Sequence, residues 1–357
     1  MIPTNPGGYR DTIDFRDYQW RELGAAAPAF DWTKGYDVET ELKKKLGLGF
    51  LLSPNNQQQS LSCGGQAWSK YAAVQEALFT GTYEERSAKY IYAQTHAPLG
   101  GSTGRDNAQV YSKQGVAKES ILLSQPATEA FLVRSEDITT AIRLEAKLAR
   151  SSAYANVPST MEAFAQAIAA NGGLIGGLNG SNNGTWLTPF PQPPKAGQPL
   201  WGHWVFFGKA FRIKNRPHVG FLNSWGPNCG LNGWQWINED YFNALVNYDG
   251  TLSSAVWQGW AHVFNTDTPP GQFNHTFTTD LVVNEQSEEV RALQTALQVE
   301  GDFPATIKPT GFYGTVTSAA VLKFQKRYAV APVSELNAIQ GKRVGPKTRK
   351  KLNEIFS

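Results

Sequence analysis

Four residues of the chain carry the side chains that thiol chemistry requires: Gln57, Cys63, His203 and Asn223. A cysteine is a strong nucleophile only as a thiolate, and a free cysteine has a pKa near 8.5, so little of it is ionised at neutral pH. A neighbouring imidazole accepts and returns the proton, and a third group orients the ring. A cysteine, a histidine and an asparagine in this chain order therefore predict covalent attack on an amide carbonyl.

The sequence around these residues indicates how each would be positioned. Cys63 begins an apolar stretch, 63–78, that predicts a buried helix, and a helix N-terminus favours a negative thiolate. An imidazolium at His203 can lower the pKa of the thiol further, and the side-chain carbonyl of Asn223 can hold the ring. Gln57 and the backbone N–H of Cys63 can both donate to an oxyanion. An inert, buried cysteine is the alternative interpretation.

Residues 30–265 show a mixed hydrophobic pattern. Helices are predicted at 63–78 and 162–170, and short strands at 173–178, 204–207, 219–222 and 234–237. Helices followed by strands predict an α+β domain with two lobes. The long loop 180–199 ends just before His203, so we expect it to line the rim of the cleft.

Three other segments flank or follow this domain. Residues 1–29 are polar and rich in Gly and Pro, which predicts an extended arm packed on the domain, with a disordered tail as the alternative. Residues 266–283 contain Pro269-Pro270-Gly271 and predict a linker. Residues 284–357 have eleven Lys and Arg against seven Asp and Glu, and their apolar residues recur at helical spacing. They predict a separate three-helix, all-α domain.

Composition excludes several classes of function. The net charge of +3 is small and its Lys and Arg residues are dispersed, so nucleic acid is not an expected partner. The two cysteines, Cys63 and Cys229, have no metal-ligand spacing, and we expect neither a disulfide framework, a metal nor a cofactor. No apolar run is long enough to span a membrane, and the N-terminus lacks a secretory signal. We expect synthesis in the cytoplasm, unless a leader has been trimmed; the oligomeric state stays open.

The sequence Asn-Ser-Trp-Gly at 223–226, followed by Gly-x-Asn-Gly-Trp at 230–234, is the most specific motif in the chain. With Gln57 and Cys63 it resembles the papain-like cysteine peptidases, and the divergent bacterial and phage members most closely. The resemblance covers about 30–265 and implies a helical lobe against a barrel-like β lobe, with the cleft between them. The resemblance also implies that Gln57, Cys63, His203 and Asn223 are catalytic.

The same resemblance implies substrate contacts. Gly100 and Gly101 match the glycine pair whose backbone pairs with the substrate peptide, and Trp204 and Trp225 are expected beside the substrate. The chain departs from the family in lacking the second cysteine three residues before the nucleophile. The residues before Asp31 are too few for the long inhibitory propeptide of the family, so its usual zymogen is not implied.

An alternative alignment would make Cys63 that second, structural cysteine. The nucleophile would then fall on Gln66, and the protein would be inactive. This alignment puts Ser60 in place of the oxyanion glutamine, whereas the first alignment puts Gln57 there. The spacing favours the active alignment.

The C-terminal residues resemble the peptidoglycan-binding domain of bacterial and phage cell-wall hydrolases. The resemblance rests on helical residues from Val290 onward, on Gly311-Phe312-Tyr313-Gly314, and on Thr317. It implies a three-helix bundle with a binding groove at Gly311, Phe312, Tyr313, Gly314 and Thr317. Its positive charge suits an anionic wall polymer. A general protein-interaction module is the alternative.

Together these features predict a cysteine peptidase that cleaves peptide bonds in bacterial peptidoglycan, as a phage endolysin-like hydrolase acting at the cell wall. One alternative is a wall-docked protease for protein substrates. A second, of another class, is a wall-binding protein without catalytic activity.

Overall fold

The computed structural model describes residues 5–12, 14, 20, 29–248, 250, 252–263, 273, 275–304, 307 and 309–356. The chain divides into two compact units, Met1–Asn265 and Thr266–Ser357, and each is described by itself. Residues 264–272 and 274, which include much of the predicted linker, lie outside the described residues. None of the helices described combines the length and the apolarity that crossing a membrane requires.

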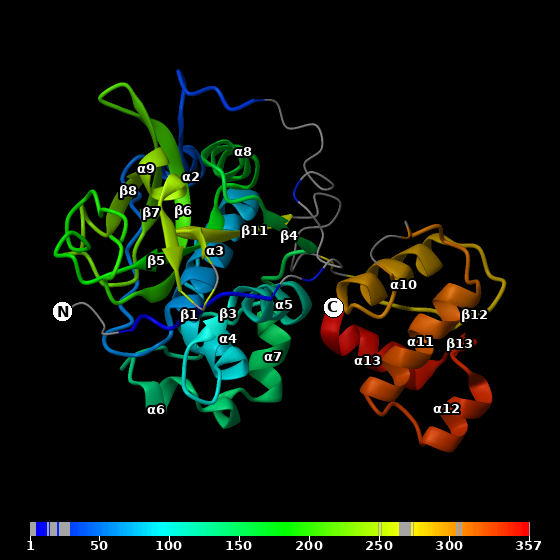
Figure 1. Cartoon of the computed structure of the whole chain (residues 1–357). Coiled ribbons are helices and arrows are strands. Elements are labelled where there is room, and N and C mark those ends of the chain that lie inside the picture. Colours follow the sequence, from blue (N-terminus) through cyan, green and yellow to red (C-terminus); the bar gives the residue numbers. More distant parts are fainter. Residues whose placement is uncertain are drawn as a thin grey trace. The chain divides into compact units, whose positions relative to one another are not determined.

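A long central helix, α3 (Cys63–Thr80), forms the middle of the helical half of the first unit. It is buried along most of its length, and α4 (Ala88–Thr95) and α5 (Gly104–Gln114) pack against it (Figure 1). Gly65 permits the close approach of α4, because a Cβ atom there would lie 2.7 Å from the Ala88 carbonyl oxygen. The predicted helix at 63–78 is confirmed, and its N-terminus is held inside the protein.

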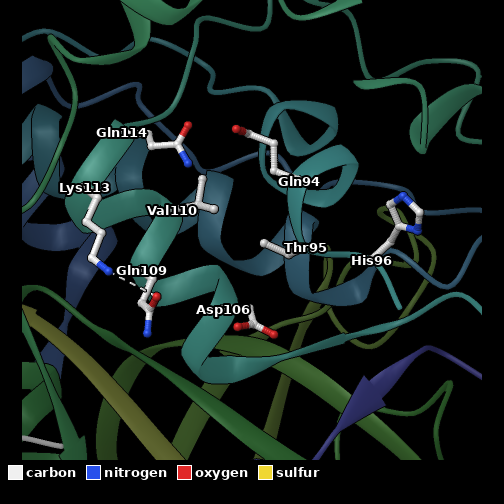
Figure 2. A pocket seen from close by; sticks show the side chains of 8 residues that line it. All are labelled: Gln94, Thr95, His96, Asp106, Gln109, Val110, Lys113 and Gln114. Atoms are coloured by element: carbon white, nitrogen blue, oxygen red, sulfur yellow. Dashed lines mark hydrogen bonds between the residues drawn. The ribbon is translucent and has the colours of Figure 1, made fainter. Parts of the chain in front are cut away.

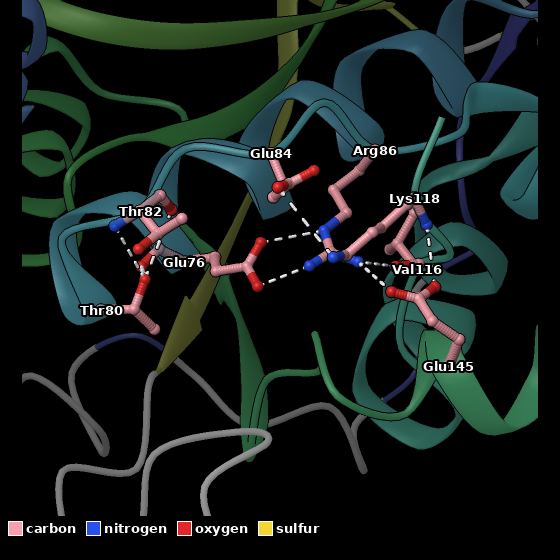
Figure 3. Close-up of polar contacts among 8 residues, drawn as sticks. All are labelled: Glu76, Thr80, Thr82, Glu84, Arg86, Val116, Lys118 and Glu145. Carbon is pink, nitrogen blue, oxygen red and sulfur yellow. Dashed lines mark hydrogen bonds and ion pairs between the residues drawn. The ribbon is translucent and has the colours of Figure 1, made fainter. Parts of the chain in front are cut away.

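A buried arginine joins the helices around α3 (Figure 3). Arg86 donates to the Glu76 carboxylate on α3, to Glu145 on α7 (Thr140–Ala146), and to the Val116 carbonyl. Its side chain is almost fully buried, so these acceptors replace the water that the guanidinium loses. The network ties three separate segments into one helical layer.

The other half of the first unit is a seven-stranded sheet in the order β4-β11-β5-β6-β7-β8, with β2 paired to β6. All of its pairings are antiparallel. The strands are β2 (Tyr36–Asp37), β4 (Ala153–Val157), β5 (Leu174–Gly180), β6 (Trp201–Ile213), β7 (Arg216–Leu222), β8 (Trp234–Asn238) and β11 (Val256–Val263). Within the described residues the sheet does not close on itself, so the expected barrel-like lobe is an open sheet.

Helix α8 (Met161–Asn171) covers one part of this sheet. Its N-cap residue Thr160 accepts a hydrogen bond from the Ala163 N–H, which satisfies a free donor of the first turn. Phe164 on its buried face packs edge-on against Phe207 of β6. The other elements whose bounds the structure describes in this unit are β1 (Gly8–Tyr9), α2 (Val38–Leu46), β3 (Ser102–Thr103), α6 (Glu129–Leu132), the 3-10 turn Ser135–Asp137, α9 (Glu239–Asn243), β9 (Leu245–Asn247) and β10 (Leu252–Ser254).

The predicted α+β class of this unit is confirmed, as are its two predicted helices and four predicted strands. The strand predictions were too short, above all 204–207, which lies within the thirteen-residue β6. Residues 201–210 of this strand are all buried. Apolar and polar residues therefore do not alternate along it, and the pattern does not mark where the strand begins and ends.

The second unit is helical, but it is not a simple three-helix bundle. Its described residues form four helices and a two-stranded ladder: β12 (Leu281–Val282), α10 (Glu288–Val299), α11 (Thr315–Arg327), α12 (Val333–Ile339), β13 (Arg343–Val344) and α13 (Pro346–Phe356). Phe277 and Leu281, inside the predicted linker 266–283, are buried in its core. The predicted linker therefore extended too far toward the C-terminus. Two isolated apolar residues do not form a helical or strand pattern, so the local sequence does not indicate that they are buried.

Candidate active site

The structure brings the histidine and the asparagine together at adjacent strands. His203 lies on β6 and Asn223 directly follows β7, which pairs with β6. His203 Nε2 lies 2.9 Å from Asn223 Oδ1, within hydrogen-bonding distance. The oxygen can only accept, so Nε2 carries the proton and Nδ1 is the basic nitrogen. Nδ1 is buried and has no hydrogen-bond partner among the described residues.

Cys63 lies against the strand that carries His203. The backbone N–H of Trp204, the residue after the histidine, donates to Cys63 Sγ at 3.4 Å. Cys63 is the first residue of α3, so its thiol lies at the helix N-terminus, close to the N–H groups of Cys63 and Gly64. The nucleophile and base predicted from sequence are thus held at one place by α3 and β6.

Gln57 and Cys63 donate to the same peptide carbonyl, and it belongs to this chain. Gln57 Nε2 lies 3.1 Å from the Pro6 carbonyl oxygen, and the backbone nitrogen of Cys63 lies 3.4 Å from the same atom. The Ser224 hydroxyl donates to Gln57 Oε1 at 2.8 Å, which fixes the orientation of the amide. These two donors are the pair that the sequence predicts at an oxyanion.

The N-terminal arm reaches this site as an added strand. Its β1 pairs in parallel with β3, and the Ser102 N–H donates to the Gly7 carbonyl at 2.9 Å. The fit depends on glycine: a Cβ atom at Gly8 would lie 2.7 Å from the His203 backbone nitrogen. One at Gly101 would lie 2.5 Å from the Tyr9 ring and 2.6 Å from the Gly7 carbonyl oxygen. Residues 5–12 of the predicted arm lie against the first unit, with the Pro6 carbonyl bound by Gln57 and Cys63.

An acidic residue anchors the far end of this segment. The Asp11 carboxylate accepts from the backbone N–H of Arg105, at the start of α5, and from Trp260 Nε1 at 3.2 Å. Burial raises the pKa of Asp11 to about 6, although the Arg105 N–H and charge act in the opposite direction. The arm is therefore held at both ends, by the Pro6 carbonyl and by Asp11.

Burial favours the neutral forms of both Cys63 and His203. Burial raises the pKa of Cys63 to about 12, outweighing the N–H groups of Trp204, Gly64 and Cys63 that lower it. Burial also lowers the pKa of His203 to about 4, against a smaller opposite effect of Asn223. The thiolate and imidazolium expected from sequence are disfavoured in this covered site, because its surroundings have a low dielectric constant.

Of the two tryptophans expected beside the substrate, one lies at the site and the other is buried in the interior. Trp225 is half-buried and stacks on the His203 ring, with centroids 5.0 Å apart. Trp204 is fully buried between Trp68 and Trp257, so its indole does not line the cleft as the sequence suggested. The Trp204 side chain is large and mostly apolar, so removing its surface from water favours an interior position. Its backbone N–H is the part that reaches the site.

Gly101 does lie where a peptide strand runs, and Gly100 lies beside Leu61 and Glu129. Both glycines have positive φ values, 83° at Gly100 and 77° at Gly101, which a residue with a side chain rarely adopts. The peptide that Gly101 contacts here is the arm.

The alternative alignment finds no support in the contacts of Gln66. Its side-chain amide donates to the Ser62 hydroxyl at 3.1 Å, within the first turn of α3. The atom that receives the Trp204 N–H is Cys63 Sγ.

Three residues near the site were not predicted from the sequence. Pro6 supplies the bound carbonyl, Ser224 orients Gln57, and Gln235 accepts from Asn223. Ser224 stands inside the Asn-Ser-Trp-Gly motif, which could have identified it. The glycine pair after Pro6 was a signal for close backbone approach, and nothing in the local sequence identifies Gln235.

A polar pocket lies apart from these groups, between α4 and α5 (Figure 2). Its volume is about 520 Å³, and it is lined by Gln94, Thr95, His96, Asp106, Gln109, Val110, Lys113 and Gln114. None of the predicted catalytic side chains lines it.

The predicted wall-binding residues of the second unit differ in how far they are exposed. Tyr313 is fully buried and donates to the Gly341 carbonyl, and the buried Thr317 hydroxyl accepts from Gln294. These two side chains hold the turn rather than face a ligand, which corrects the predicted groove. Gly311 is buried, Gly314 is half-buried, and Phe312 is 45% exposed. Phe312 is the large side chain of this turn that a ligand could contact.

Comparison with known proteins finds a similarity for each of the two units. The first unit has the fold of xylellain, a cysteine protease from Xylella fastidiosa, with a TM-score of 0.57, 17% identity, and coverage of 74% of this chain and 97% of that one. It is also similar to proCathepsin B S9 from Trypanosoma congolense, with a TM-score of 0.52, 12% identity, and coverage of 73% and 86%. No curated protein matches the sequence.

Residues 286–332 match a family described as "Putative peptidoglycan binding domain". This match falls entirely within the second unit. The chain thus joins a unit with the fold of papain-like cysteine proteases to a unit that contains a peptidoglycan-binding family match.

Proposed function

We propose that this chain is a cysteine peptidase that cleaves peptide bonds in bacterial peptidoglycan. The observation that carries the proposal is the Pro6 carbonyl, which accepts from Gln57 Nε2 and from the Cys63 N–H. A peptide carbonyl in this place lies at the backbone N–H of Cys63, the first residue of α3, and is polarised by two donors. The arrangement is suited to stabilise the oxyanion that forms when a thiolate attacks an amide.

The reaction follows from the positions of four side chains. The proton of the Cys63 thiol passes to His203 Nδ1, and Sγ attacks the carbonyl carbon of the substrate. Negative charge on the carbonyl oxygen is stabilised by Gln57 and by the Cys63 N–H. His203 then gives its proton to the leaving amine, and water hydrolyses the resulting thioester. Asn223 keeps Nε2 protonated throughout, so Nδ1 stays the basic nitrogen.

The arm must leave before a substrate can enter. In this proposal the Pro6 carbonyl occupies the place of the substrate carbonyl, and the Gly7 N–H donates to Asn5 Oδ1 within the arm. Departure of the arm also admits water, which removes the main cause of the raised Cys63 pKa.

Targeting to the wall is assigned to the second unit. The support is the family match at 286–332, the exposed ring of Phe312, and the excess of Lys and Arg over Asp and Glu in 284–357. We propose further that the protein acts as an endolysin-like hydrolase of phage origin. Incubating purified sacculi with the protein, and identifying the new amino termini by mass spectrometry, tests this function directly. Sacculi that gain no new amino termini, while a protein substrate is cleaved, would contradict it.

A second candidate, a wall-docked protease for protein substrates, is favoured by one observation. The segment held in the site is an ordinary polypeptide, Asn5 to Asp11, with no feature specific to the cell wall. Casein digestion by the full chain, compared with sacculus digestion at the same enzyme concentration, separates the two candidates.

Removing the second unit is expected to separate chemistry from targeting. A chain ending at Pro269 should hydrolyse a short soluble peptide at the rate of the full chain, because every proposed catalytic residue lies in the first unit. Its activity on sacculi should fall by as much as ~10²–10⁴-fold, since tethering raises the effective concentration at an insoluble substrate. Release of soluble wall fragments measures the second rate. The separate fragment 273–357 should sediment with sacculi, and its retention in the supernatant at low salt would contradict the targeting role.

The Gln57→Ala substitution is expected to lower kcat by about 10²-fold with little change in KM, because the lost donor acts mainly on charge in the transition state. Gln57 also binds Pro6, so the measurement belongs in a chain whose arm is displaced by Gly8→Ala. The matched control is Gln58→Ala, which removes an exposed amide bonded to Gln125. Equal kcat values for the two variants would show that Gln57 is not an oxyanion donor.

A further inference from the structure

A buried glutamine determines which way the Asn223 amide faces. Gln235 lies on β8 and is fully buried, and its Nε2 donates to the carbonyl oxygens of Trp186, at 2.9 Å, and Thr188, at 2.7 Å. Backbone carbonyls can only accept, so the nitrogen of the Gln235 amide must face them. Its oxygen then faces Asn223 Nδ2, at a distance of 2.7 Å.

The opposite end of the Asn223 amide is fixed as well. Oδ1 accepts from the Ser224 backbone N–H at 2.8 Å and pairs with His203 Nε2. Nδ2 has one further contact, Cys229 Sγ at 3.5 Å, and that thiol donates to the Trp186 carbonyl. Every donor in this network meets an acceptor, and the direction is set at one end by two main-chain carbonyls.

We propose that Gln235 is a positioning residue for the histidine of the peptidase. By binding Asn223 Nδ2, it keeps Asn223 Oδ1 on His203 Nε2, and so keeps the basic lone pair on Nδ1. The inference rests on the proposed function, because it concerns the same histidine. If the amide of Asn223 turned over, Nδ2 would face Nε2, and the proton would move to Nδ1, where it blocks acceptance of the thiol proton.

The loop 181–200 is the support for this arrangement. It supplies both carbonyls that bind Gln235, and the Trp186 ring lies 6.1 Å from the His203 ring and 5.7 Å from the Trp225 ring, centroid to centroid. The sequence predicted a loop at the rim of a cleft. The structure assigns it an interior task, since Trp186 is fully buried and its main chain orients the Gln235–Asn223 pair.

The test replaces Gln235 by methionine, which keeps the length of the side chain but has no N–H donor or carbonyl oxygen. In the full chain, ¹⁵N NMR of the histidine rings reports the His203 tautomer, with the four other histidines as internal references. We expect wild type to show the Nε2–H form and Gln235→Met to show a substantial Nδ1–H population. With a soluble peptide, kcat should fall about 10-fold while KM changes by less than twofold.

A second variant distinguishes orientation from packing. Gln235→Glu places a carboxylate against two carbonyls, so it should impair the tautomer and kcat at pH 8. Protonation restores one O–H donor and one oxygen acceptor, and burial raises the pKa of a carboxyl group. Activity relative to wild type should therefore recover as the pH falls toward about 5. A merely structural defect would not recover in this way.

The control is Gln75→Met on α3. Gln75 is also a buried glutamine, and its Nε2 donates to Tyr71, Asn171 and His262, away from Asn223. It should lose stability without any change in the His203 tautomer. A wild-type tautomer in Gln235→Met would overturn the proposal, as would a Gln235→Glu defect independent of pH if Gln235→Met does not fold. The NMR result stands even if the protein cleaves no peptide, so failure of the proposed function is recognised separately.

Discussion

Cys63→Ala should abolish peptide hydrolysis, with a fall in kcat/KM of at least about 10⁴-fold, while the fold is retained. The thiol is the nucleophile of the proposed reaction, and removal of such a group leaves only the rate that binding and oxyanion stabilisation provide. Cys63 is fully buried at the start of α3, and alanine fits the same space with the loss of one sulfur atom. Hydrolysis of a fluorogenic peptide and thermal unfolding are the two measurements.

The matched control for Cys63→Ala is Ser69→Ala. It removes one polar atom from a buried position on the same helix, where the hydroxyl donates to the Gln66 carbonyl. This variant should keep its activity within about twofold of wild type. Hydrolysis by Cys63→Ala at the wild-type rate would refute the assignment of the nucleophile. If wild type, control and variant are all inactive on peptides and on sacculi, the inactive wall-binding protein becomes the better interpretation.

Gly8→Ala should activate the enzyme and expose its thiol. A Cβ atom at Gly8 would lie 2.7 Å from the backbone nitrogen of His203 and 2.9 Å from the carbonyl carbon of Gly202, and main-chain atoms shift at a higher cost than the end of a flexible side chain. If the covered state loses about 2 kcal/mol, the open fraction rises about 30-fold while it is small. Both peptide hydrolysis and alkylation of Cys63 by iodoacetamide should rise by this factor.

The control for Gly8→Ala is Gly49→Ala, at a glycine with no atom near the position of an added Cβ. It should alter neither rate. Cys229 provides an internal reference, since burial raises its pKa to about 12 and its thiol contacts Asn223 and the Trp186 carbonyl. Faster alkylation of both cysteines would indicate general unfolding, and an unchanged Cys63 rate would show that the arm does not limit access.

The arm illustrates what local sequence patterns cannot predict. Its own residues predicted an extended, packed segment, and residues 8–9 of it pair with β3 in the first unit. Nothing in the pattern indicated that β1 would pair with β3, nearly a hundred residues later, or that Pro6 would meet Gln57. The resemblance did not imply the family's usual zymogen, but a few residues reach the site because Gly7 and Gly8 permit close contact with the main chain.

Identities of the candidate catalytic residues could be derived from the sequence, because chemistry restricts them to few residue types. Cys63, His203, Asn223 and Gln57 were selected by type, order and spacing, and the structure places them together, while their roles stay proposals. The helix that begins at Cys63 was also predictable, since a long apolar stretch is a local signal.

The tertiary structure alone decided the protonation states of the candidate catalytic residues and the contacts that other side chains make with them. The sequence suggested a charged Cys63–His203 pair, whereas burial beneath the arm favours the neutral forms of both. In the same way, Trp204 and Tyr313 turned inward, and Gln235 came to bind Asn223 from a strand twelve residues away. Residue type and spacing determine which reactions a chain can perform. Water exclusion and hydrogen-bond direction depend on which distant segments pack together, and no local pattern contains that information.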